Sequence, residues 1–325
     1  MKEENGAIPN GSSSSNKTKV KPLRYSDCGL IGETEKLTSS VVVPNSRIKA
    51  PSESGAESNS GDITTEWNVD EQDELLSAVM CSTWETREPT AEQTASGVTE
   101  VKALRMGDNR STFSLIKKYT QSPVEYQHFK NEQVNQLTVN MPLKSFVTMN
   151  WSFMGANHPK TETTDPLTNV TNASYETAST TKAFKTLEGY FKIGDSFDSF
   201  ENCRQASNFT LSINNNMEST SALFEKEAIE QSLGDFEVTG SFDIYKAGDF
   251  SRVLENEAIE GKEKAIKVVV SRTEGNVNTS YAINITCNLD GCTESKDGNK
   301  LKNTISFSVG KSNGLEITKM IKTVA

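Results

Sequence analysis

The sequence predicts a mainly β protein, an antiparallel β-sandwich or barrel with two or three short helices. Segments in which apolar and polar residues alternate recur along the chain, as expected for strands with one buried and one wet face. Turn residues such as Gly275, Gly291 and Gly298 separate several of them. The hydrophobic fraction is only 34%, and Ser, Thr and Asn are abundant. This composition is more typical of strands with one solvent-exposed face than of a compact α/β enzyme.

The clearest alternation lies near the middle of the chain. Apolar and uncharged polar residues alternate over 136–141 and again over 147–153. Only a few residues around Pro142 separate the two runs, which is the length of a hairpin connection. We therefore expect a long antiparallel hairpin with one face in a core and the other facing water.

The N-terminal part predicts an arm, a loop and a helix. Residues 1–22 are polar and Ser-rich, so they bury too little apolar surface to offset the entropy of ordering, and we expect a flexible arm. The composition of 51–61 is typical of a loop and predicts a projecting hairpin tip. Apolar residues at helical spacing follow several acidic ones, which predicts a helix over about 70–82. Residues 85–100 are interpreted as a polar linker.

The second half begins with a Thr-rich segment over 155–182 that has few apolar residues. Such a long loop is often functional, and we expect it to contact a neighbouring subunit. Alternation returns in a strand pair within 207–245, whose connection predicts a helical turn. A short helix is expected over 248–256, followed by the strands Ile266–Val270, Tyr281–Cys287 and Ile305–Val309.

Charge and side-chain chemistry argue against several functions. The formal net charge is −10, whereas a nucleic-acid-binding protein usually shows a basic patch. Five cysteines without a pairing pattern and only two histidines predict neither a disulfide scaffold nor a metal site. No nucleophile elbow, phosphate loop or dinucleotide motif is present, and no cofactor or catalytic residue is predicted. We interpret His128 as a structural residue in a turn anchored by Tyr126 and Phe129.

The order of several segments gives the chain a family resemblance. TFSLIKKY is followed by EYQHFKNEQVN, the VNQLTVNM strand and FVTMNWSFMG. LIGET and GDITTEWNVDEQDELLSAVMCSTW come before them, and SNFTLSINNNM and GDFEVTGSFDIY come after them. Together, over roughly residues 25–250, these segments resemble the major tail tube proteins of long-tailed (siphovirus-type) bacteriophages.

The resemblance implies a structural virion protein. In that family six subunits each give four strands to a continuous inner β-barrel, and the rings stack into a conduit for viral DNA. It implies contacts with copies of itself, with a tape measure protein and with tail terminator and tip proteins, assembly in the host cytoplasm, and DNA passing through the lumen without specific binding. Residues expected to face the lumen are Thr138, Asn140, Thr148, Asn150, Ser152, Thr210, Ser212, Glu237, Thr239, Ser241 and Asp243.

Two questions stay open from the residues alone. Residues 23–325 are expected to form the tail tube domain, and 250–325 either complete it or form a partly separate outer β module. An immunoglobulin-like decoration or adhesion protein of a virion surface is the alternative function. A polysaccharide-cleaving enzyme would need a carboxylate pair such as Asp195 and Asp198, but their spacing alone does not select them.

Overall fold

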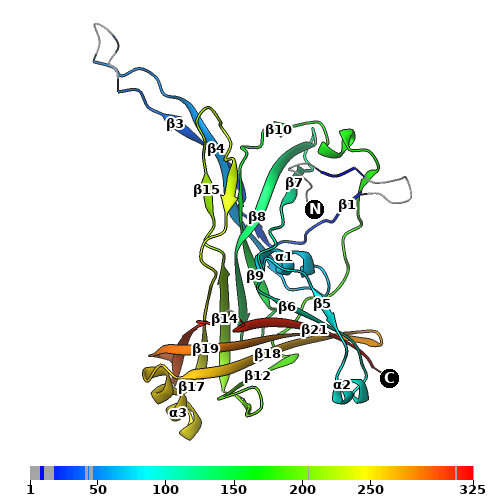
Figure 1. The fold of residues 1–325 in the computed structure, drawn as a ribbon, viewed down its shortest axis with the longest axis vertical. Coiled ribbons are helices and arrows are strands. Elements are labelled where there is room, and N and C mark those ends of the chain that lie inside the picture. Colours follow the sequence, from blue (N-terminus) through cyan, green and yellow to red (C-terminus); the bar gives the residue numbers. More distant parts are fainter. Residues whose placement is uncertain are drawn as a thin grey trace.

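The computed structural model confirms the mainly antiparallel β-fold. It describes residues 8–10, 18–40, 43, 47–203, 205–311 and 313–324. Seventeen of its strands belong to one hydrogen-bonded network, and this network folds into two layers whose strands cross steeply in Figure 1. The α-helices of the described part are α1 (Asp73–Val79), α2 (Ala91–Ala95) and α3 (Gly248–Ile259).

The first layer, the central sheet, runs along the long axis of the molecule (Figure 1). Each strand pairs antiparallel with the next. The predicted central hairpin is confirmed as β8–β9, and the pair predicted within 207–245 is confirmed as β14–β17. In spatial order the strands are β4 (Glu53–Glu66), β9 (Thr148–Gly155), β8 (Glu125–Pro142), β14 (Ala206–Asn214), β17 (Glu237–Tyr245) and β20 (Lys300–Ser308).

The second layer, the crossing sheet, is joined to the first through the long strand β19. The first part of β19 pairs with β18 and β21. From Asn288 onward β19 pairs with β20 of the central sheet, with a register shift between Leu289 and Gly291. In spatial order the crossing sheet contains β12 (Gly189–Gly194), β18 (Glu263–Glu274), β19 (Val277–Asp297), β21 (Leu315–Thr323), β6 (Val98–Arg105) and β5 (Glu85–Arg87).

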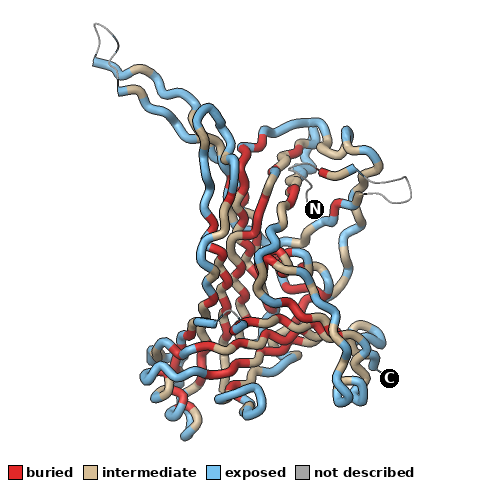
Figure 2. Tube along the Cα trace, viewed as in Figure 1, coloured by how far each residue is buried: buried red, intermediate tan, exposed pale blue. Residues whose placement is uncertain are grey.

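Aromatic side chains fill the space between the two layers. Phe191 of β12 lies 5.2 Å from Phe242 of β17 and 5.9 Å from Phe209 of β14, measured between ring centroids. A second group joins Trp67 to Tyr281 of β19, with centroids 5.0 Å apart. Figure 2 shows this buried zone where the layers meet. Burying large rings contributes most of the hydrophobic stabilisation that holds two such layers together.

The helices agree with two predictions and add one. α1 lies within the predicted 70–82 and buries its apolar residues, and α3 starts at the predicted position but runs three residues past 256, to Ile259. α2 lies in the segment interpreted as a linker, because Thr90 and Gln93 form a reciprocal capping box that stabilises a helix start. That linker also contains β5 and the first residues of β6.

Two segments differ from their predictions because pairing overrides composition. The sequence predicts that residues 51–61 form the loop at the tip of a projecting hairpin. A hairpin of β3 (Ile31–Leu37) and β4 does project from the body (Figure 1), but most of these residues lie in its strand β4. The connection expected to contain a helical turn forms a two-stranded ribbon, β15 (Glu218–Thr220) and β16 (Glu230–Ser232). In both, cross-strand backbone hydrogen bonds stabilise extended chain that carries few apolar residues.

His128 lies in a strand and not in a turn. It belongs to β8, opposite Ile116 of β7 (Phe113–Tyr119). The alternation of β8 is interrupted where Asn131 adopts a φ of 55° and the register with β7 shifts. Such a bulge adds a residue to one strand. Burial does not alternate beyond it, since Glu132, Gln133 and Val134 are all buried, and the sequence does not show a continuous strand.

The remaining strands are short. β1 (Thr18–Val20) pairs parallel with β11 (Ala173–Tyr175). Most of the predicted arm over 1–22 lies outside the described residues. Within 250–325, strands pair with β12, β17 and β6; the division of the chain into domains stays a prediction. Further short elements are β2 (Asp27–Cys28), β10 (Thr161–Glu162), β13 (Glu201–Asn202) and the 3-10 turn η1 (Pro166–Asn169).

Candidate functional site

The residues predicted to face a lumen lie on one face of the central sheet. Across β8 and β9, Thr138 is opposite Asn150, and across β8 and β14 it is opposite Ser212. Ser212 is in turn opposite Thr239 of β17. Directly opposite residues of neighbouring strands point to the same side of a sheet. We call this side the polar face; it includes Thr138, Asn140, Thr148, Asn150, Ser152, Thr210, Ser212, Glu237, Thr239, Ser241 and Asp243.

Side chains on the polar face bond to each other across the strands. Gln136 donates to the Ser212 hydroxyl over 2.9 Å. Asn150 donates to Asp62 Oδ2 over 3.2 Å and accepts from the Thr64 hydroxyl. Cross-strand pairs of this kind contribute modestly to stability, roughly 0.2–1 kcal/mol each. They also satisfy donors and acceptors among neighbouring side chains while keeping them on the surface of the sheet.

The opposite side of the same strands fixes which residues reach the polar face. Leu137, Val139, Met149, Trp151 and Leu211 are all at most 2% exposed. A slip of one residue in any strand would turn this set outward and bury the polar one, so burial of the apolar side enforces the register. The polar face is therefore the surface that remains once the core is packed.

The middle of the polar face carries no charge. Neither 136–142, 148–155 nor 206–214 contains Asp, Glu, Lys, Arg or His. Acidic residues lie at its margins, where Glu237 is exposed opposite Asn214. Asp243 differs from the other ten residues, because it is only 6% exposed and accepts from Lys302 Nζ over 2.7 Å and from the Thr304 hydroxyl over 2.6 Å.

Two further strands extend the polar face, although the sequence did not predict that they belong to it. β4 adds Asp62, Thr64 and Glu66, whose positions are opposite Ser152, Asn150 and Thr148. The sequence shows that this segment has a polar and an apolar side, because these residues alternate with Ile63, Thr65 and Trp67, which are buried. On the other side β20 adds Thr304, Ser306 and Ser308, opposite Asp243, Ser241 and Thr239.

A glycine allows the central sheet to pack closely beneath the polar face. A Cβ added at Gly240 of β17 would lie 2.3 Å from Phe307 Cζ and 2.5 Å from the Thr210 carbonyl oxygen. Gly240 falls in the apolar register between Val238 and Phe242. The absent side chain leaves room for the Phe307 ring, as expected for a glycine inside a strand.

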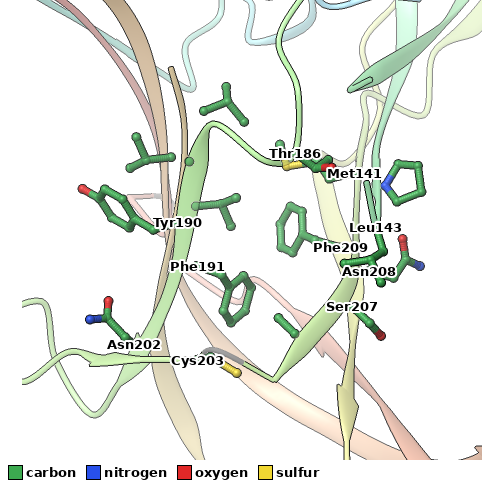
Figure 3. A pocket seen from close by; sticks show the side chains of 16 residues that line it. Met141, Leu143, Thr186, Tyr190, Phe191, Asn202, Cys203, Ser207, Asn208 and Phe209 are labelled. Atoms are coloured by element: carbon green, nitrogen blue, oxygen red, sulfur yellow. The ribbon is translucent and has the colours of Figure 1, made fainter. Parts of the chain in front are cut away.

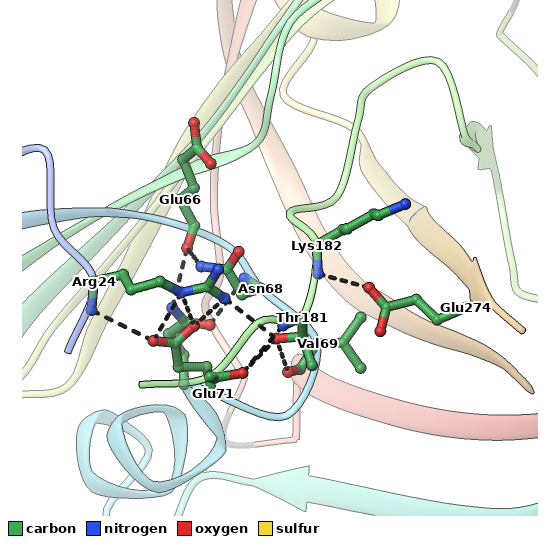
Figure 4. Close-up of polar contacts among 10 residues, drawn as sticks. Arg24, Glu66, Asn68, Val69, Glu71, Thr181, Lys182 and Glu274 are labelled. Carbon is green, nitrogen blue, oxygen red and sulfur yellow. Dashed lines mark hydrogen bonds and ion pairs between the residues drawn. The ribbon is translucent and has the colours of Figure 1, made fainter. Parts of the chain in front are cut away.

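The Thr-rich segment over 155–182 is held at its C-terminal end by its own chain (Figure 4). Thr181 donates to the Val69 carbonyl over 3.1 Å and accepts from Arg24 over 3.2 Å. Arg24 also forms an ion pair with Glu71, with its Nη2 2.5 Å from Oε2. The backbone N–H of Lys182 donates to Glu274 over 2.6 Å. Charge-assisted bonds such as these fix the segment's orientation.

Neither metal nor membrane chemistry is indicated in the described part of the chain. There, no group of three or more His, Cys, Asp or Glu side chains is arranged to hold a metal ion. Over the same residues, no helix has the length and apolar character needed to cross a membrane. His128 is half-buried beside the Ser114 hydroxyl, and burial together with the charge of Lys130 lowers its pKa to about 4. A neutral imidazole in a strand fits a structural role.

Comparison with protein-family models gives a match over most of the chain. A family model described as phage tail tube protein matches residues 5–309 of the chain. The matched range includes every strand of the central sheet and therefore the whole polar face. No curated protein matches the chain at a significant level.

Proposed function

This chain belongs to the phage tail tube protein family, and from that premise we propose that six copies close into a ring and that rings stack into the conduit through which viral DNA is ejected into the host. Membership makes it a structural component of the virion tail that assembles into a multi-subunit tube. The proposal adds the ring of six, the siphovirus type of tail and the passage of DNA. No catalytic role is proposed.

The polar face is the observation that carries this proposal. DNA binding draws much of its affinity from lysines and arginines that displace counterions from phosphate. The middle of the face offers hydroxyl and amide groups but no cation, so a duplex in the bore meets no fixed positive charge there. With −10 per chain, six copies carry about −60 per ring, which further disfavours adhesion within the Debye length of about 10 Å.

The open edges of the sheet support contacts between neighbouring subunits. The four strands predicted to line the barrel, β9, β8, β14 and β17, are already bordered within the chain by β4 and β20. Among the described strands, β3 pairs only with β4, and β19 beyond Asn288 pairs only with β20. Unpaired strand edges bind other strands readily. We therefore place the lateral contacts between neighbouring subunits at β3 and the end of β19, and not at the edges of the four barrel strands.

We also propose contacts between stacked rings and with other tail proteins. The β3–β4 hairpin projects from the body of the molecule (Figure 1), and we propose that it contacts a subunit of the next ring. A tape measure protein would occupy the bore before DNA enters, and terminator and tip proteins would contact the first and last rings. Assembly in the host cytoplasm completes the proposal.

Electron microscopy of the purified, concentrated protein tests the proposal directly. We expect rings with six-fold symmetry or tubes with a central channel. Discrete monomers or trimers at every concentration would contradict it and would favour an immunoglobulin-like decoration or adhesion protein instead. Rings of another symmetry would be consistent with a tube of stacked rings but would contradict the proposed six copies per ring.

A further inference from the structure

We propose that the tip of the β15–β16 ribbon of one copy, led by Leu223 and Phe224, inserts into an apolar hollow at the far end of a second copy in the adjacent ring. The inference rests on the proposed stacking of rings. It assigns one pair of surfaces to that contact, a projecting apolar tip and a hollow on the same chain.

The ribbon tip exposes apolar side chains without cover from its own chain. Phe224 is fully exposed and Leu223 is 85% exposed. Phe224 has a φ of 71°, in the left-handed region that bulky residues rarely adopt. A large ring held in water by an uncommon backbone conformation indicates a role in contact with another molecule.

The base of the ribbon is anchored, so the tip is presented in a defined place. Gln133 of β8 donates to Gln231 Oε1 over 2.9 Å, and Arg110 donates to the Gln231 carbonyl over 2.7 Å. The backbone N–H of Glu57 in β4 donates to the Lys226 carbonyl over 2.7 Å. A pre-ordered tip loses less conformational entropy on docking than a mobile one.

The hollow lies between β12 and the adjoining ends of β8 and β14 (Figure 3). Its volume is about 420 Å³, within the range of roughly 300–1,000 Å³ that accommodates small molecules, so a phenyl ring and a leucine side chain fit. Its lining is largely apolar, and one of its members, Leu143, is 50% exposed. Further apolar lining comes from Met141, Phe191 and Phe209.

The tip and the hollow lie at opposite ends of the central sheet. The ribbon follows Asn214, which is opposite Gln136, whereas the hollow lies where Asn208 is opposite Pro142. Six residues of strand separate these levels, about 20 Å at 3.3 Å per residue. Figure 1 shows β15 toward one end of the molecule and β12 at the other. A chain therefore cannot fill its own hollow.

Two different surfaces at opposite ends make a heterologous contact. Such contacts repeat head to tail and form open stacks unless a rotation closes them. Stacked rings need a repeat of this kind along the tube, whereas contacts within a ring run sideways. A second copy is therefore the occupant that the geometry favours.

Disulfide trapping tests the contact. In the double variant Leu143→Cys/Phe224→Cys, oxidation of assembled tubes should produce a ladder of dimers, trimers and longer chains on a non-reducing gel. Each link must join two copies, because the two positions are too far apart within one chain for a disulfide. The control Ile259→Cys/Phe224→Cys, with the hollow cysteine moved to the exposed Ile259 of α3, should give no ladder. Both variants also carry Cys203→Ser, because the free Cys203 lines the same hollow. If tubes of the Leu143→Cys/Phe224→Cys variant form normally but give no more cross-linked product than the control, the inference is overturned.

A charge at the tip separates this inference from the proposed function. Phe224→Asp should leave rings intact but reduce tube length at least tenfold by electron microscopy, while Ile259→Asp should leave tubes unchanged. Full-length tubes from Phe224→Asp would overturn the inference and leave the tube proposal standing. If the unaltered protein forms neither rings nor tubes, the proposed function itself is contradicted.

Discussion

Lys319 of β21 forms a buried ion pair with Asp73, the first residue of α1, and the Tyr281 hydroxyl donates to the same carboxylate over 2.6 Å. The Lys319 side chain is only 6% exposed. Burial alone would lower the pKa of Lys319, but attraction to Asp73 and hydrogen bonds to Asp70 and Asp73 raise it above its ordinary value. This cluster attaches α1 to the crossing sheet.

Asp73→Asn should therefore destabilise the fold. Removing one partner of a buried pair leaves an uncompensated charge, which typically costs about 3–5 kcal/mol, and we expect about 3 kcal/mol because Asp70 still contacts Lys319. Chemical unfolding measures the loss. Asp249→Asn is the matched control, since Asp249 also lies in the first turn of a helix but its pair with Arg252 is exposed; that change should cost under about 1 kcal/mol. Equal losses would contradict the role given to the cluster.

His128 should make the fold sensitive to mild acid. Its pKa is about 4 in the folded chain and about 6.5 when unfolded, so the unfolded chain binds more protons between these values. Stability is then fully present above pH 6.5 and is lost as the pH falls toward 4. We expect the melting temperature to fall over that window, and His128→Gln to flatten the fall.

The other histidine provides the control for this pH dependence. His158 lies in a loop, where its Nδ1 is 2.5 Å from the Thr34 hydroxyl. His158→Gln should keep the slope of melting temperature against pH between 4 and 6.5 that the unaltered protein shows. If both variants flatten the slope alike, burial of His128 is not its cause.

The sequence predicts those strands whose two faces differ along their whole length. β8 and β9 alternate cleanly over 136–141 and 148–153 because one side packs in the core and the other bears uncharged polar residues. β21 was missed because Lys319 occupies a buried position that alternation assigns to an apolar residue. Its partner Asp73 lies 246 residues away, so no pattern in the sequence around Lys319 indicates this ion pair.

The candidate site shows the same limit. Local alternation identified residues such as Thr138 and Thr210 on the polar face, since each position depends only on its own strand. The burial of Asp243 depends on Lys302, 59 residues later in the chain, and could not be foreseen. The membership of β4 likewise required its pairing with β9, which only the folded chain reveals.

Gly240→Ala should destabilise the protein although it adds a single methyl group. The new Cβ would approach the Thr210 carbonyl and the Phe307 ring, both held in packed surroundings. Overpacking of this kind costs roughly 1–3 kcal/mol, measurable by chemical unfolding. Gly310→Ala is the control, because its nearest neighbour, an Asn288 side-chain nitrogen, is 3.8 Å away. A neutral Gly240→Ala would mean that the sheet relaxes at this point.

Lysines on the polar face provide the sharpest test of the bore. Thr148 and Asn150 are partly exposed neighbours on β9. If they line the lumen, Thr148→Lys/Asn150→Lys should still assemble into tubes, since the side chains extend into open solvent. The new cations should bind phosphate, slow DNA ejection and make its rate depend on salt, because counterion release scales with the number of cations in contact.

The control adds the same charge elsewhere. Thr94→Lys/Asn276→Lys places one lysine at an exposed position of α2 and the other in an exposed turn, and should leave assembly and ejection unchanged. Folded monomers of the Thr148→Lys/Asn150→Lys variant that fail to assemble would show that these residues lie in a contact between subunits. Normal tubes with normal ejection would show that DNA never meets them. In either case the polar face would not be the wall of the conduit.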